Sequence, residues 1–152
     1  MCQVPEVENT EHVLRAIFEP SFLEDDGSLS PSAFYMQVLS RGKKENYISV
    51  FRKEYGEKLG IPFPTLKPRV HGDTLCGYAE LLTKDVRDIS IGAIQVDIKE
   101  FPTKSNPAHA GLYIVINHDE QNADDFSEVP LSSQLLFVLK QLTNKSIFNR
   151  LA

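Results

Sequence analysis

Residues 106–116 read NPAHAGLYIVI, and this segment is the most strand-like in the chain. Pro107 fixes its own φ angle and favours an extended conformation at Asn106, so the entry to the strand is rigid. Side chains alternate between the two faces of a strand. One face therefore carries a mixed set of residues, namely His109, Gly111, Tyr113 and Val115. The other face is aliphatic and is expected to pack on the core, with Ala110, Leu112, Ile114 and Ile116.

His109 opens this strand on the mixed face, and two interpretations of it stand. In the first, a ring nitrogen of His109 ties down the loop that contains Pro107, and the histidine is structural. In the second, His109 takes part in chemistry. A lone histidine seldom catalyses without partner groups, so the structural interpretation is favoured.

The length and composition are typical of one folded domain. The chain has 152 residues, of which 41% are hydrophobic and 24% are charged. A chain of this size buries enough surface to fold without a disulfide or a metal. We expect a single domain over residues 1–152, with a flexible N-terminus at 1–8.

The two cysteines, Cys2 and Cys76, do not support a disulfide framework. The first residues lack the basic segment and the apolar run of a signal peptide, and no apolar run is long enough to cross a bilayer. We expect a cytoplasmic protein that does not associate with a membrane.

The net charge of −5 argues against tight, nonspecific binding of nucleic acid, which depends on clustered lysines and arginines. A local basic cluster does occur over residues 41–53, but Glu45 interrupts it and only Tyr47 and Phe51 are available for stacking. A solvated surface is the favoured interpretation, and nucleic acid remains a possible but not a favoured partner.

The pattern of apolar residues predicts an α+β fold in a single compact domain. Helices are predicted from Asn9 or Thr10 to about residue 18, over 52–59, over 84–88 with Thr83 as the cap, and over 131–142. Strands are predicted over 76–82, 94–98 and 109–116, with a hairpin of 34–38 and 48–50 around a turn at 41–44. We expect a mostly antiparallel sheet of about four or five strands, packed against the C-terminal helix. Residues 118–128 are predicted to be an acidic loop.

The sequence lacks a glycine-rich phosphate loop, a Cys-x-x-Cys pair, a His-Glu-x-x-His segment and a Gly-x-Ser-x-Gly elbow. No cofactor or metal is predicted. One catalytic arrangement remains open, in which His71, within His71-Gly72-Asp73, and His109 share acid and base roles on a phosphoester. Lys67, Arg69 or Lys104 would stabilise the developing charge. His71 is equally suited to a simple turn, and His12 and His118 are weaker candidates.

A binding module makes fewer demands on the sequence, since it needs an exposed sheet edge or an apolar groove. The proline-rich segment 62–68, the strand that contains Tyr78 and the Phe34-Tyr35 segment could supply one, and the candidate binding residues are Asn106, Tyr113 and Asp73.

Four short motifs occur in order along the chain: Asp26-Gly27, Ser32-Ala33-Phe34, Ser49-Val50 and Asn106-Pro107-Ala108-His109. Together they resemble small uncharacterised bacterial proteins over residues 18–142. The resemblance implies a compact bacterial domain, and it carries no assigned reaction. The acidic stretch after Ile116 departs from that pattern.

These observations predict a cytoplasmic bacterial protein that binds another macromolecule, with a protein as the favoured partner, as an accessory component. The alternative prediction is a small, metal-independent phosphoesterase or ribonuclease that uses His109 and His71.

Overall fold

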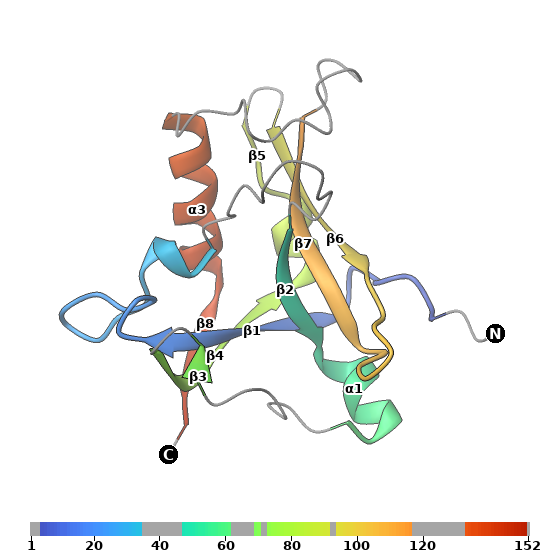
Figure 1. Cartoon of the computed structure of the whole chain (residues 1–152). Coiled ribbons are helices and arrows are strands. Elements are labelled where there is room, and N and C mark those ends of the chain that lie inside the picture. The colour runs from blue at the N-terminus through green and yellow to red at the C-terminus, as the bar shows by residue number, and fades with distance from the viewer. Residues whose placement is uncertain are drawn as a thin grey trace, which may run out of the picture.

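The structure is a computed structural model, and it describes residues 4–34, 47–61, 69–70, 73–91, 94–116 and 133–151. They form one antiparallel sheet with helices beside it, which confirms the α+β class (Figure 1). The strands are β1 His12–Glu19, β2 Tyr47–Arg52, β3 Arg69–Val70, β4 Asp73–Leu82, β5 Ser90–Ile91, β6 Ile94–Glu100, β7 His109–Ile116 and β8 Ile147–Arg150. The helices are the 3-10 helix η1 Pro31–Phe34, and α1 Lys53–Leu59, α2 Thr83–Arg87 and α3 Ser133–Lys145.

The sheet has more strands than the sequence predicts. Its order is β3-β4-β1-β2-β7-β6-β5, and β8 pairs with β4 beside this path. The predicted number of about four or five is therefore too low. Strands β3, β5 and β8 are only two to four residues long, and such short segments carry no periodic pattern of apolar residues.

The predicted helix up to residue 18 is wrong, because residues 12–19 form strand β1. Val13 and Ile17 face the main core, and Leu14 is buried on the opposite face of the sheet. A strand that is buried on both faces loses the two-residue alternation, and its apolar residues then also fit helical spacing. Eight register pairs with β4 fix β1 as a strand.

The sheet bends sharply between β1 and β2. These strands pair at Val13↔Arg52 and Leu14↔Phe51, and Figure 1 shows β1 running across the direction of β2, β7 and β6. Where the strands part, Arg15 donates from Nε to the Ala33 carbonyl at 3.0 Å and from a terminal nitrogen to the Ser49 carbonyl at 3.2 Å. Its guanidinium thus replaces ladder hydrogen bonds at the bend, and burial lowers the pKa of Arg15 to about 10.

The core lies between the sheet, α3 and η1. Helix α3 confirms the predicted C-terminal helix, and it buries Val138, Leu139 and Leu142 in the main cluster. It contacts η1, α2 and β5. From β7, Ala110 and Leu112 are fully buried in the same core, which confirms the predicted aliphatic face at these two residues.

The predictions around the shorter elements have mixed outcomes. Helix α1 confirms the helix predicted over 52–59, and Gly60 ends it with a φ of 74°. Helix α2 is present, but Thr83 is its first residue and not its cap. Leu82 is the extended cap residue, and the buried Thr83 hydroxyl has no hydrogen-bond partner among the described residues, so it caps no backbone N–H.

In the predicted hairpin, the second strand is present as β2, but Phe34 belongs to η1 and not to a strand. Phe34 is fully buried in the main cluster together with residues of α3, so packing holds it in the 3-10 turn. The rest of the first predicted strand, the turn at 41–44 and the acidic loop over 118–128 lie outside the described residues.

Candidate functional site

The outer face of β2, β7 and β6, which turns away from α3 and the main core, brings aromatic side chains together. Tyr47 lies opposite Tyr113 in the register of β2 and β7, and Lys99 of β6 lies opposite Gly111 of β7. Residues that are opposite each other in an antiparallel sheet project to the same face. We call Tyr47, Phe101, His109 and Tyr113 the aromatic patch.

Two rings of the aromatic patch lie flat on the backbone of β7. The rings of Tyr47 and Phe101 are stacked, with centroids 4.7 Å apart and 13° between their planes. A β-carbon at Gly111 would lie 2.6 Å from Phe101 Cδ2 and 2.9 Å from Tyr47 Cδ2. Glycine is therefore required at position 111 for the rings to sit where they do. Phe101 remains 41% exposed in this arrangement.

His109 stiffens the loop that carries Phe101. Its Nδ1 lies 2.7 Å from the Phe101 carbonyl oxygen, which can only accept, so Nδ1 is the protonated nitrogen. The backbone N–H of Phe101 donates back to the His109 carbonyl, and Asn106 Oδ1 accepts the Ala108 N–H at 3.0 Å. These contacts agree with the structural interpretation of His109, and they place Asn106, a candidate binding residue, in the same hydrogen-bonded turn. They also leave Nε2 of His109 as the nitrogen available to a ligand.

The other end of the aromatic patch is polar, and it carries both acidic and basic side chains. The Tyr113 hydroxyl donates to Asp97 at 3.3 Å, and Arg87 pairs with the same carboxylate at 2.8 Å. Burial raises the pKa of Tyr113, so its hydroxyl stays protonated at neutral pH. The Lys99 ammonium lies 5.8 Å from the centre of the Tyr113 ring.

The structure does not bring every predicted site residue to this face. Asp73 begins β4 and Arg69 begins β3, and both β1 and β2 lie between β4 and β7. Lys104 is exposed in the loop before β7. His71 and Lys67 lie outside the described residues. In the described part of the chain, no lysine or arginine is hydrogen-bonded or ion-paired with His109, so the phosphoesterase hypothesis stays a prediction.

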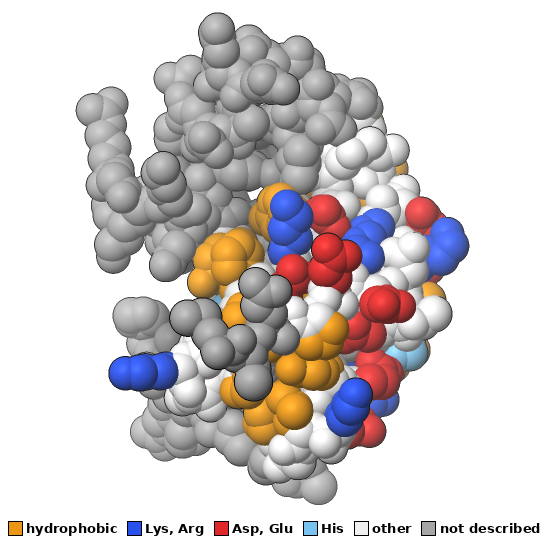
Figure 2. Space-filling view, turned by 90° about the vertical axis from the view of Figure 1, so that its right-hand side faces the viewer, with side chains coloured by type: hydrophobic (Ala, Val, Ile, Leu, Met, Phe, Trp, Pro, Cys, Tyr) orange, Lys and Arg blue, Asp and Glu red, His pale blue; other side chains and the backbone are white. Residues whose placement is uncertain are grey.

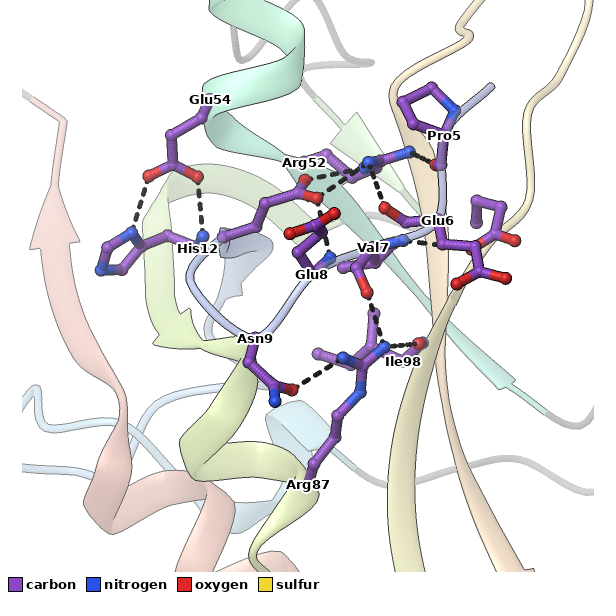
Figure 3. Close-up of polar contacts among 12 residues, drawn as sticks. Pro5, Glu6, Val7, Glu8, Asn9, His12, Arg52, Glu54, Arg87 and Ile98 are labelled. Carbon is purple, nitrogen blue, oxygen red and sulfur yellow. Dashed lines mark hydrogen bonds and ion pairs between the residues drawn. The ribbon is translucent and has the colours of Figure 1, made fainter. Parts of the chain in front are cut away.

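A buried arginine forms a second polar centre, which the sequence did not reveal (Figure 3). Arg52 is 1% exposed and donates to both oxygens of Glu11 at 2.9 Å. It also donates to the carbonyls of Pro5 and Glu6, at 2.7 and 3.2 Å. Its guanidinium stacks on the ring of Tyr55, 4.3 Å from the centroid. Each of its three guanidinium nitrogens donates a hydrogen bond within the chain, so this arginine serves to hold structure.

Arg87 holds the same N-terminal segment from the other side. It donates to the Val7 carbonyl at 2.8 Å and to Asn9 Oδ1 at 2.8 Å, as Figure 3 shows. The Val7 side chain is 3% exposed, and its N–H donates to Glu100. Residues 4–8 belong to the N-terminus predicted to be flexible, and these contacts tie them to β2, α2 and β6.

His12 and Glu54 form a third polar group, where the first residue of β1 meets the first turn of α1. His12 Nδ1 lies 2.6 Å from one oxygen of Glu54, and the His12 N–H donates to the other at 2.7 Å. Burial raises the pKa of Glu54, but the two hydrogen bonds from His12 outweigh it and leave the pKa below its ordinary value. The two residues are far apart in sequence, and no local motif signals their pairing.

Other features bear on the class of site. No group of histidine, cysteine, aspartate and glutamate that could hold a metal ion occurs among the described residues. Within the same residues, no helix is long and apolar enough to span a membrane. No family model, no curated protein and no solved structure matches this chain. The resemblance to small bacterial proteins therefore stays a prediction.

Proposed function

We propose that this protein is a binding component that holds a protein partner through the aromatic patch. The observation that carries the proposal is the stacked pair of Tyr47 and Phe101, which lies on Gly111 with Phe101 41% exposed. A large exposed aromatic side chain on a sheet is a feature of protein interfaces, where aromatic residues are enriched.

Contacts within the aromatic patch fix the positions of its rings before a partner binds. The Tyr47 ring contacts Phe101 face to face and His109 edge to face, with the latter centroids 6.0 Å apart. His109 in turn fixes the Phe101 carbonyl. A ligand that packs on these rings would lose little side-chain entropy on the protein's side, which favours affinity.

The surroundings of the patch suit a protein better than a nucleic acid. Figure 2 looks onto the side of the molecule where β6, β7 and α1 lie, and hydrophobic side chains gather in the middle of this face beside acidic and basic ones. Asp97 and Glu100 flank Lys99 on β6. Phosphate backbones require clustered positive charge, whereas a peptide with an apolar side chain and mixed charges complements this surface.

Affinity capture with the full chain tests the proposal. Three proteins are compared: the wild type, Phe101→Ser, and Leu136→Ser as the control. Leu136 is 46% exposed on α3, away from the patch, so its loss removes the same kind of exposed side chain. We expect wild type and control to retain one stoichiometric protein, identified by mass spectrometry, and Phe101→Ser to weaken its binding at least about tenfold by calorimetry.

Two results would contradict the proposal. The first is equal retention of the same partner by all three proteins, which would place its binding site elsewhere. The second is recovery of nucleic acid, detected by its absorbance and by nuclease sensitivity, as the ligand that Phe101→Ser loses.

A further inference from the structure

Among the described residues, strand β8 forms an open edge of the sheet. It pairs with β4 from Gly77↔Arg150 to Glu80↔Ile147, and it has no second partner strand among the described residues. The edge of β6 differs, because it is covered: Arg87 donates to the Ile98 carbonyl, and Val96 N–H donates to the Ile89 carbonyl. An open edge presents backbone groups that can pair with another chain.

The backbone groups on this edge can be assigned from the ladder. The Leu151 N–H donates to the Cys76 carbonyl at 2.8 Å, so residue 151 turns its polar groups toward β4. Alternate residues of an antiparallel strand turn the same way. The polar groups of Phe148 and Arg150 therefore point outward, away from β4.

Two exposed apolar side chains flank this edge. Ile147 is 64% exposed, the highest fraction among the large hydrophobic side chains described, and Leu151 is 39% exposed. We propose that β8 pairs with β8 of a second copy of this chain. The two strands are antiparallel, and the register is centred on Asn149, so that Asn149 of each copy lies opposite Asn149 of the other. The proposal concerns a surface separate from the aromatic patch and does not depend on the proposed function.

The register follows from the residues themselves. Centring on Asn149 places Ile147 of each copy opposite Leu151 of the other, so the two exposed aliphatic side chains cover each other. It also places Phe148, whose backbone polar groups point away from β4, opposite Arg150, and within one chain the Arg150 guanidinium already lies 5.8 Å from the Phe148 ring. Cross-strand pairs of this kind stabilise a sheet.

The two neighbouring registers are worse. Centring on Arg150 would set two arginines directly opposite each other, which is destabilising. Centring on Phe148 would set Ile147 opposite the polar Asn149 and leave Leu151 uncovered. A second copy is thus the occupant whose side chains complement this edge.

Sedimentation of the full chain over a range of micromolar concentrations tests the proposal. We expect a reversible dimer of twice the 17.1 kDa monomer mass, and Ile147→Asp should raise its dissociation constant at least about tenfold. Leu136→Asp, at an exposed position of α3, should leave it unchanged. The double variant Ile147→Lys with Leu151→Glu should restore dimerisation, because it places opposite charges across the interface. Circular dichroism verifies that each variant is folded.

Disulfide trapping tests the register separately. In a chain with Cys2→Ser, Asn149→Cys should form a covalent dimer on mild oxidation, because directly opposed residues of a non-hydrogen-bonded pair have Cα atoms about 4.5 Å apart, within disulfide range. Arg150→Cys should cross-link more slowly. A monomer at all concentrations, a dimer unaffected by Ile147→Asp, or faster trapping through Arg150→Cys would overturn the proposal.

Discussion

The guanidinium of Arg52 binds both carboxylate oxygens of Glu11 at 2.9 Å, and the arginine is 1% exposed. The same carboxylate accepts the Glu8 N–H at 2.8 Å, and the Glu11 carbonyl accepts the Thr83 N–H. This pair therefore joins the N-terminal segment to β2 and to the start of α2. Arg52 and Glu11 thus form a structural ion pair, in which the charge of each residue is compensated by the other.

Glu11→Ala leaves the Arg52 charge buried without its carboxylate. We expect the free energy of unfolding to fall by about 3 kcal/mol, as for other buried pairs that lose one member. Urea unfolding followed by circular dichroism measures the change. Glu24→Ala, at an exposed position in the turn before η1, is the control and should change stability by less than about 0.5 kcal/mol. Equal effects of the two substitutions would show that the pair contributes nothing.

The hydrogen bonds from His12 make stability depend on the ionisation of Glu54. The pKa of Glu54 in the folded protein is below its ordinary value of 4.5, so its contribution is complete above that pH and is lost as the pH falls through the folded value. Glu54→Gln should therefore flatten the loss of stability below about pH 4.5, when compared with the wild type. Urea midpoints measured at several pH values check this. An unchanged profile would contradict it.

Gly111→Ala should displace the rings of Tyr47 and Phe101, because the added β-carbon would lie 2.6 Å from Phe101 Cδ2. We expect a loss of about 1–3 kcal/mol in unfolding free energy, which is typical of overpacking. In a Phe101→Ala background the same substitution should cost less, since the closest ring is absent. A double-mutant cycle from urea unfolding measures this coupling, and additive effects would argue against the contact.

Thr83→Val should keep or raise stability, by up to about 1 kcal/mol, because the buried Thr83 hydroxyl has no hydrogen-bond partner among the described residues. Thr143→Val is the matched control, since the Thr143 hydroxyl donates to the Leu139 carbonyl at 2.8 Å. The control should lose about 1 kcal/mol. Thermal unfolding of the two variants compares them, and a larger loss for Thr83→Val would refute the assignment.

The elements that the sequence predicts well are those with one clear apolar face. In β7, the apolar spacing predicts the strand and the side that faces the core, and Ala110 is fully buried as expected; in α3, it predicts the helix, which buries Leu142 in the core. In β1, Val13 and Leu14 are buried on opposite sides of the sheet. That double burial removes the periodic signal, so the strand was mistaken for a helix.

The site was predicted only in part, for a similar reason. His109 and Tyr113 stand in a strong strand pattern and were identified, whereas Phe101 lies just beyond the end of β6 and carries no periodic signal. The available clue was the spacing of Phe101, which continues the alternating series of Asp97 and Lys99 and so places an aromatic residue on their polar face. Arg52 and Glu11 are 41 residues apart, so only the folded sheet reveals their pairing.

The brief contact of β1 with β2 has a mechanical consequence. The ladder between these strands is narrow, with Val13↔Arg52 and Leu14↔Phe51 as its register pairs, and Arg15 bridges the gap beside it. Under a pulling force or on warming, this seam would open before the broad ladder of β1 with β4 or of β6 with β7. The two parts of the sheet, β1 with β4 and β2 with β7 and β6, would then be held together by the side chains of their shared core.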